Sequence, residues 1–338
     1  MLSRFRFVLA VVIVAAMLLS GVQYLGFFPG LAQGGTELLP TYRLGTLPAT
    51  DPASDLWAEV EPLQMPMSGQ TVVEPRRPVS FVESLEVRAL YNATHIAFRL
   101  SWPDAVKDNR TIETGQFRDA VAIQVAPASA TPYLCMGAAG VRLQIMQWKA
   151  DWQADLEEGF KDLEDAFPNF WSDYYPFAIG GPPYRVPEGF SENASVYLVG
   201  YEVGNPFSQP LKVTAVEDAA AEGFFTITTQ ARQDALGRGL WSDGRWGVVI
   251  TRALVTGDSQ DVPIANGAIV AFAVWDGSSG DVGARKSVST WATLNLGGGA
   301  VPSDYVARVA IVAGILLALV VGSLVVLRRK KKGGEGLP

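Results

Sequence analysis

The feature that most constrains this chain is an uncharged apolar run near its C-terminus, from Val309 to Leu327. A helix needs about 20 apolar residues to cross the hydrocarbon core of a bilayer. Five basic residues, 328–332, follow the run directly, and a basic cluster at the end of a span marks the cytoplasmic side. We therefore predict a transmembrane helix over residues 305–328, a cytoplasmic tail over 329–338, and a body on the extracytoplasmic side of a cell membrane.

The N-terminus predicts the same topology independently. Arg4 and Arg6 precede an apolar stretch that runs from Phe7 to about Leu19, which is the order of charge and apolar residues in an export signal. Residues 1–29 are then either a cleaved signal peptide or a signal anchor, and the protein crosses the membrane once or twice. Residues 30–50 are rich in Gly, Pro and Leu without periodicity, which predicts a linker.

Composition narrows the chemistry of the remaining body, residues 51–296. With Cys135 as its one cysteine, the chain forms no intramolecular disulfide and depends on a hydrophobic core. With His95 as its one histidine, it lacks the residues for a multi-histidine zinc site, for bis-histidine haem or for c-type haem attachment. The net charge is −7 and the body has no basic patch, which argues against nucleic acid as a partner.

Alternating apolar residues predict β-strands through most of the body. Residues 83–102 have this pattern on both sides of the turn Asn92-Ala93-Thr94, which is typical of a β-hairpin. Further strands are expected at 119–126, 141–148, 195–201, 211–216, 223–229, 246–252, 268–275 and 287–294. Short strands separated by Gly, Pro and Asp turns predict a mainly β fold, a single antiparallel β-sandwich. Residues 152–177 mix helix formers with aromatic residues and predict an inserted helix and loop.

Two stretches differ from ordinary strand and turn sequence, although neither forms a recognisable enzyme active site. In the first, residues 132–152, Met136 stands in a tight turn before Gly137. In the second, residues 275–291, Lys286 follows a Gly-rich loop and precedes a strand.

These stretches carry a resemblance to a known family. The motifs PYLCMG, QWKADWQ, AVWDG and RKSVSTW occur in this order, together with LYNATHIAFRLSWPD, FRDAVAIQVAP and DPASDLWAEVEPLQMPMSGQ. This combination resembles the γ subunit of the type II dimethyl-sulfoxide-reductase family, the ethylbenzene-dehydrogenase-type haem-binding domain. Relatives serve nitrate, selenate and chlorate reductases and dimethylsulfide dehydrogenase. The resemblance covers roughly residues 50–296. Several relatives are soluble periplasmic subunits, whereas this chain adds a C-terminal span.

The resemblance implies one non-covalent haem b with methionine and lysine as axial ligands. Matched motif by motif, the ligands are Met136 in PYLCMG and Lys286 in RKSVSTW. A lysine amine binds iron only when its pKa, ordinarily about 10.4, is strongly lowered, and both desolvation and the charge of the iron favour this.

Other donors compete with this assignment. Met146 in a predicted strand is the main competing sulfur, and Met65 and Met67 lie in a segment expected to be a loop. Lys149 is the main competing amine, and its neighbours Trp148 and Trp152 could flank a haem edge or pack in the core. Remaining candidates are expected to be structural: Cys135 as a small buried thiol, and His95 as an exposed residue on the face opposite Ile96, Phe98 and Leu100.

The implied function is electron transfer by a non-catalytic subunit. Its haem would exchange electrons with an iron–sulfur β subunit that connects to a molybdenum catalytic α subunit, and with a cytochrome or quinone partner at the membrane. The alternative is a membrane-tethered β-sandwich that binds carbohydrate or another ligand through exposed Trp241, Trp246 and Trp275.

Overall fold

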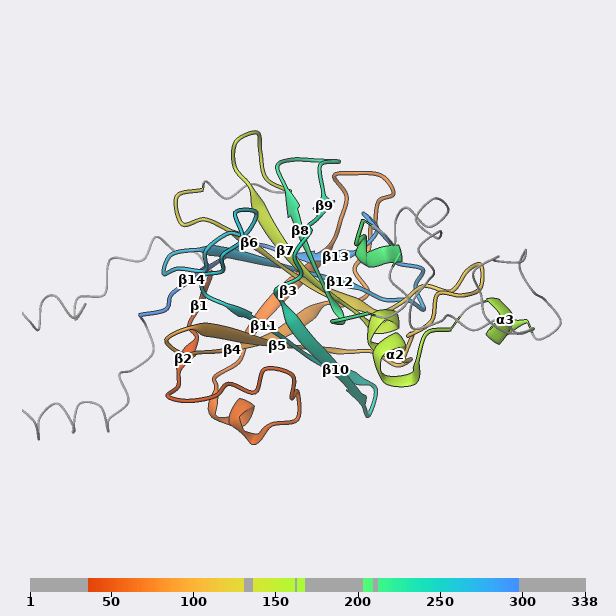
Figure 1. Ribbon diagram of the computed structural model, residues 1–338, viewed down its shortest axis with the longest axis horizontal. Helices are drawn as coiled ribbons and strands as arrows, with labels where there is room; N and C mark the ends of the chain where they lie inside the picture. The colour runs from red at the N-terminus through yellow and green to blue at the C-terminus, as the bar shows by residue number, and fades with distance from the viewer. Residues whose placement is uncertain (1–35, 131–135, 162, 168–202, 209–211, 298–338) are drawn as a thin grey trace, which may run out of the picture. The chain divides into compact units, whose positions relative to one another are not determined.

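The computed structural model describes residues 36–130, 136–161, 163–167, 203–208 and 212–297 (Figure 1). Within these ranges, no helix is both long enough and apolar enough to cross a membrane. The predicted N-terminal segment 1–29 and the predicted span 305–328 lie outside them.

The described part of the chain is mainly β, as predicted. The strands are β1 (Thr36–Leu38), β2 (Thr41–Tyr42), β3 (Leu63–Gly69), β4 (Ser84–Tyr91), β5 (His95–Pro103), β6 (Ala120–Ala126), β7 (Leu143–Lys149), β8 (Val216–Ala221), β9 (Thr228–Thr229), β10 (Leu236–Ser242), β11 (Arg245–Ala253), β12 (Ile269–Trp275), β13 (Ser287–Ser289) and β14 (Ala292–Leu294). The helices are short: η1 (Asp55–Glu59), α2 (Ala150–Glu158), α3 (Leu163–Ala166) and η3 (Pro206–Ser208).

The described strands form one continuous sheet that changes direction at β3. The main path runs β10-β11-β5-β4-β3-β13-β12-β6-β7-β8-β9. Residues 63–66 of β3 pair with β4, whereas residues 67–69 pair with β13, so β3 belongs to both halves. Every pairing along this path is antiparallel; β1 and β2 add parallel pairings at β14 and β4. The antiparallel prediction is confirmed, but a single bent sheet takes the place of two separate ones.

The best-predicted element is the β4–β5 hairpin. Asn92 organises its turn, because the Asn92 side-chain oxygen accepts hydrogen bonds from the backbone N–H groups of Thr94 and His95. Alternation then points Phe98, Leu100 and the other even-numbered residues of β5 into one buried cluster. That cluster is the main hydrophobic core, and it contains residues from both halves of the sheet.

Two tryptophans connect the halves across this core. The ring centroids of Trp148 in β7 and Trp246 in β11 are 4.9 Å apart, in an edge-to-face arrangement that aromatic pairs prefer. Strand β10 approaches Trp148 so closely that a Cβ on Gly239 would lie 2.4 Å from the indole. The Gln153 side chain in α2 joins the two elements: its oxygen accepts from Trp148 Nε1 and from Gly239 N, and its amide donates to Gly239 O.

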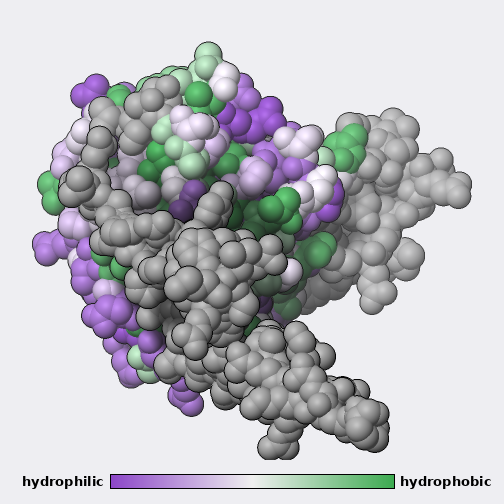
Figure 2. All heavy atoms as spheres, turned by 90° about the vertical axis from the view of Figure 1, so that its left-hand side faces the viewer, coloured by the Kyte–Doolittle hydropathy of each residue, from purple (hydrophilic) through white to green (hydrophobic). Residues whose placement is uncertain are grey.

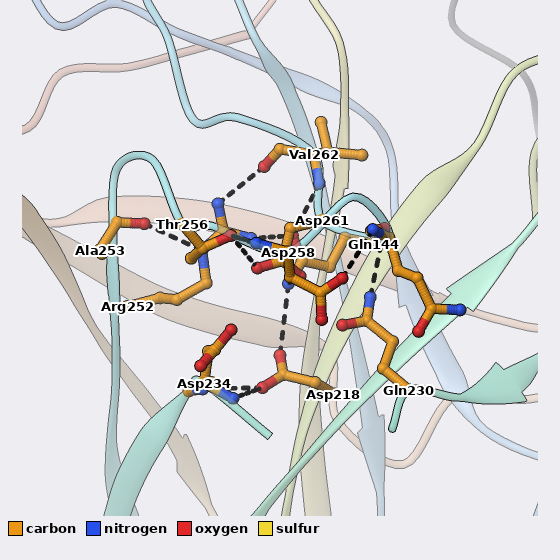
Figure 3. A network of polar contacts seen from close by, with 12 residues as sticks. Gln144, Asp218, Gln230, Asp234, Arg252, Ala253, Thr256, Asp258, Asp261 and Val262 are labelled. Atoms are coloured by element: carbon orange, nitrogen blue, oxygen red, sulfur yellow. Dashed lines mark hydrogen bonds and ion pairs between the residues drawn. The ribbon is translucent and has the colours of Figure 1, made fainter. Parts of the chain in front are cut away.

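A buried polar network forms a second link between the halves (Figure 3). Arg252 of β11 donates to the Gln144 side chain in β7 and to the carbonyl oxygen of Val262, and lies 3.8 Å from Asp261. Gln144 in turn donates to Asp261 and Asp218. Since buried charges are stable only when they are paired, this network requires all of its members.

Several expectations about single segments are corrected. Residues 36–50 were expected to be part of a linker, but they contribute β1 and β2 to the sheet. The segment with Met65 and Met67, expected to be a loop, is β3. Instead of strands at 211–216 and 223–229, the chain forms β8 at 216–221 and the two-residue β9, and the strand expected at 287–294 is divided into β13 and β14. The strand expected at 195–201 and residues 168–177 of the expected insertion lie outside the described residues.

Candidate functional site

The outer face of β6, β7, β8 and β12 is unusual for its small side chains. Alternation turns one set of residues of these strands away from the main core, and many of them are alanines: Ala120, Ala122, Ala219, Ala221, Ala271 and Ala273. Most of them gather with Ile145 and Trp275 in a separate apolar cluster, which we call the alanine face. Ala120, Ala122, Ala219 and Ala221 are themselves buried, so the alanine face is an apolar interior surface and not an exposed one.

Met136 lies at this face. Its side chain is half-buried and packs against the alanine face. Its carbonyl oxygen accepts a hydrogen bond of 2.8 Å from the backbone N–H of Gly223, which follows β8. The predicted tight turn is present: Gly137 has φ +89°, a value that L side chains rarely adopt, and a bridge joins Ala138 to Val141. The turn therefore fixes where the Met136 backbone meets the sheet.

Lys286 lies at the same face, immediately before β13. Its Nζ is 4.8 Å from the ring centroid of Trp275, which belongs to the alanine face. Trp275 is itself held in place, because its indole N–H donates to the carbonyl oxygen of Gly283 at 3.0 Å. The backbone of Lys286 is fixed by a hydrogen bond of 3.0 Å from Gln70 N to its carbonyl oxygen. The two residues singled out by the sequence are thus next to one apolar cluster.

Lys149, the competing amine, also points to this side of the sheet but is already paired. Its Nζ is hydrogen-bonded to the buried carboxylate of Glu217 and lies 4.2 Å from the ring centroids of both Trp152 and Phe207. Burial lowers the pKa of Lys149 to about 8, although Glu217 acts in the opposite direction. If iron took this amine, Glu217 would lose its cationic partner and keep the Thr229 hydroxyl as a donor, and a buried charge without a compensating charge is strongly destabilising.

The competing sulfur atoms point into the main core. Met146, Met65 and Met67 are buried there among the residues that connect the two halves of the sheet. Trp148 belongs to the same core and so does not flank the alanine face, whereas Trp152 does contact Lys149. His95 is exposed, as expected, and its ring interacts with the Thr94 hydroxyl. Cys135 lies outside the described residues.

The donor chemistry of the alanine face fits a haem. A thioether and an amine are both competent donors to iron, and axial ligands of this kind tune the potential of the group. Gln124 of β6 pairs with Ala271 of β12 on one side and with Ile145 of β7 on the other. Its side-chain amide nitrogen is buried and has no hydrogen-bond partner within the described part of the chain. An N–H donor on this face is suited to a bound group that carries carboxylates.

The tryptophans proposed for the alternative, carbohydrate-binding function are not exposed together. Trp246 and Trp275 are buried, so that expectation is wrong for both, and Trp241 is half-buried. On the face drawn in Figure 2, hydrophobic residues are interspersed with hydrophilic ones among the described residues.

Sequence reasoning missed one cluster of functional groups. Asp104, Asp119 and Asp276 follow or precede three different strands and present carboxylate oxygens that all lie within 4.8 Å of one another. The available signal was a charged residue directly next to a strongly apolar strand, as Asp119 is to β6. No spacing rule connects these three positions, because the fold alone brings them together.

Comparisons with known proteins identify similar chains. A family model described as ethylbenzene dehydrogenase matches residues 54–287. The chain is 27% identical over 286 residues to "Putative respiratory nitrate reductase heme subunit ORF7" of Haloferax mediterranei, covering 84% of this chain and 80% of that protein. Among solved structures, family 9 carbohydrate-binding modules of Caldicellulosiruptor kristjanssonii in complex with glucose and with cellotriose align with a TM-score of 0.35 each. Their identities are 10% and 9%, over 79% and 77% of this chain and 98% and 94% of theirs.

Proposed function

Because this chain belongs to the ethylbenzene dehydrogenase family, we propose that it is the haem-binding, electron-transfer subunit of a molybdenum oxidoreductase complex and not an enzyme by itself. The observation that carries this proposal is the family match over most of the sheet domain. The relative from Haloferax mediterranei, whose name describes a heme subunit of a respiratory nitrate reductase, supports it.

The haem in this proposal is a b-type haem bound at the alanine face. Met136 and Lys286 are the axial ligands, supported by their positions next to one apolar cluster and by the commitment of the competing donors elsewhere. When bound, the haem supplies one-electron exchange. The chain's own residues would bind and orient it: the alanine face would pack against it, Trp275 would position the Lys286 amine, and the Gln124 amide would donate a hydrogen bond to it.

The Lys286 amine is half-buried and lies over the ring of Trp275, a contact that favours the ammonium form. Iron must therefore compete with this contact for the amine. Exclusion of water by the alanine face would then help to set the haem potential.

The proposal includes partners and a location. Electrons pass between the haem and an iron–sulfur subunit that serves a molybdenum subunit, with a cytochrome or quinone as the other partner. The mainly β domain is held at the outer membrane surface by a helix over residues 305–328, whose apolar run has no charge, histidine, methionine or lysine and therefore serves as a tether. Deletion of residues 305–338 should release the protein from washed membranes if residues 1–29 are cleaved as a signal peptide, whereas a retained signal anchor would keep it there.

Haem binding is tested on the full-length protein, purified from haem-supplied cells. We expect about one haem per chain, extractable by acid–acetone because no covalent attachment motif is present, and reversibly reduced by dithionite. A folded, haem-supplied preparation without haem would overturn the proposal. Binding of oligosaccharides by such a preparation would favour the carbohydrate-binding alternative.

A further inference from the structure

A second site lies at the ends of β5, β6 and β12. Asp104 follows β5, Asp119 precedes β6 and Asp276 follows β12, and one oxygen of each lies within 4.8 Å of the others. Asp104 and Asp119 are buried, with 8% and 0% of their surface exposed, whereas Asp276 is half-buried. Acidic clusters on protein surfaces are common, but two buried members require a compensating positive charge or protons.

Asp119 is fixed in place by three N–H donors. Gly277 N donates to Oδ1 at 2.9 Å, and Asp108 N and Trp246 Nε1 donate to Oδ2 at 2.8 and 2.9 Å. The loop that carries Gly277 is packed tightly, because a Cβ at this position would lie 2.2 Å from the carbonyl oxygen of Phe117. These contacts hold the carboxylate in one orientation without supplying a full positive charge.

Asp104 supplies the independent observation that points to a ligand. Its Oδ1 accepts a hydrogen bond from Val106 N, but its Oδ2 is buried and has no hydrogen-bond partner within the described part of the chain. The nearby indole N–H of Trp102 lowers the pKa of Asp104 but does not reach hydrogen-bond geometry. Trp102 Nε1 is also buried and has no hydrogen-bond partner within the described residues. A buried carboxylate oxygen without a donor is costly, so this position is suited to something that the protein chain itself does not provide.

The electrostatics of the cluster lead to the same requirement. Burial, together with the neighbouring Asp104 carboxylate, raises the pKa of Asp119 to about 8. Burial and, to a smaller extent, the carboxylates of Asp276 and Asp108 together raise the pKa of Asp104 to about 6. The charges that act most on these two groups are therefore other carboxylates. A cation would remove the repulsion that otherwise keeps protons on the cluster.

We propose that Asp104, Asp119 and Asp276 form a binding site for a divalent cation of the Ca²⁺ class. The donors are all oxygens, with no nitrogen or sulfur ligand among them, which matches hard cations and not zinc or copper. Water completes the coordination on the half-exposed side of Asp276. Because the site joins the ends of three strands from both halves of the sheet, a bound cation stabilises the fold. This structural role is independent of haem.

Terbium luminescence tests the proposal on the full-length protein after treatment with EDTA. Excitation of tryptophan should sensitise bound Tb³⁺, because Trp246 donates to Asp119 and the Trp241 indole donates to the carbonyl oxygen of Asp104. We expect saturable emission with about one Tb³⁺ per chain, displaced by Ca²⁺. We also expect Ca²⁺ to raise the midpoint of thermal unfolding.

The variants Asp104→Asn and Asp276→Asn should weaken Tb³⁺ binding by about 10-fold or more, because ligand charge sets affinity at such sites. Asp243→Asn, an exposed residue in the β10–β11 turn, is the matched control and should bind like the wild type. The half-buried Asp276 keeps the test valid if the buried variant does not fold. The proposal is overturned if emission does not saturate, or if Asp104→Asn stabilises the EDTA-treated protein while Ca²⁺ has no effect, since the cluster would then hold protons only.

Discussion

Substitution of Gly239 by alanine tests whether the two halves of the sheet meet where β10 packs on Trp148. The new Cβ would lie 2.4 Å from Trp148 Cζ2, whereas carbon atoms at rest are about 3.5 Å apart, so one partner must move by about 1 Å. Trp148 is poorly placed to move, because it is fully buried, packs against Trp246 and donates to Gln153.

The expected loss of stability follows from these contacts. Overpacking of a buried site costs about 1–3 kcal/mol, and a shift of β10 also weakens the hydrogen bonds between Gln153 and Gly239, each worth about 1 kcal/mol. We expect Gly239→Ala to lower the free energy of unfolding by about 2–4 kcal/mol in a urea titration.

Gly257→Ala is the matched control for this measurement. The nearest atom to its new Cβ is Arg232 Nη1, at 3.8 Å, which is ordinary contact. Its free energy of unfolding should stay within about 0.5 kcal/mol of the wild type. If Gly239→Ala behaved like Gly257→Ala, the close contact between β10 and Trp148 would not exist in solution.

Three further predictions concern buried charges. Arg252→Met should lower the free energy of unfolding by about 3–5 kcal/mol, because the Asp261 side chain stays buried without its cation. Arg232→Met, at an exposed ion pair, should lower it by about 1 kcal/mol or less, and equal losses in urea titrations would refute the role of burial. In chelating buffer, stability should fall as the pH rises towards about 8, because folded Asp119, whose pKa is raised to about 8, keeps a proton that the unfolded chain releases near pH 4. Asp119→Asn should flatten this part of the profile, and an unchanged slope would argue against the role of Asp119. The pKa of folded Lys149 is lowered to about 8, so between about pH 8 and 10.4 the unfolded chain keeps a proton that the folded protein has lost. Stability in thermal melts should therefore rise over this range, and an equal rise in Lys149→Met would contradict the assignment to Lys149.

The sequence predicts those parts of the fold that depend on local pattern. The β4–β5 hairpin is an example, because alternation fixes the buried face of each strand and Asn92 fixes the turn between them. Strands β6, β11 and β12 are apolar enough to be found by composition, although their boundaries differ by a residue from those expected.

Strands that depend on their neighbours escape such reasoning. Strand β8 has the sequence VEDAAA, whose residues have little preference for strands, and it forms because it pairs with β7 along its whole length. Strand β3 contains Pro66, which suggests a loop, yet its two parts pair with different strands and join the halves of the sheet. In both cases tertiary pairing overrides local propensity.

The candidate site shows the same division. Met136 and Lys286 are identified through motifs of a family, and no periodicity in the sequence would connect two residues so far apart. The alanine face is invisible from sequence because alanine carries no chemical signal, and only the register of β6, β7, β8 and β12 assembles it. The carboxylate cluster of Asp104, Asp119 and Asp276 likewise depends on which strand ends adjoin.

The most direct test of the central claim is the visible absorption spectrum of the purified full-length protein and four variants. We predict a b-type spectrum for the wild type that is lost or shifted in Met136→Ala and in Lys286→Ala. Met146→Leu in the main core and Lys107→Ala at an exposed position should keep the wild-type spectrum. A wild-type spectrum in both Met136→Ala and Lys286→Ala would contradict the assignment of these two residues as the ligands of haem.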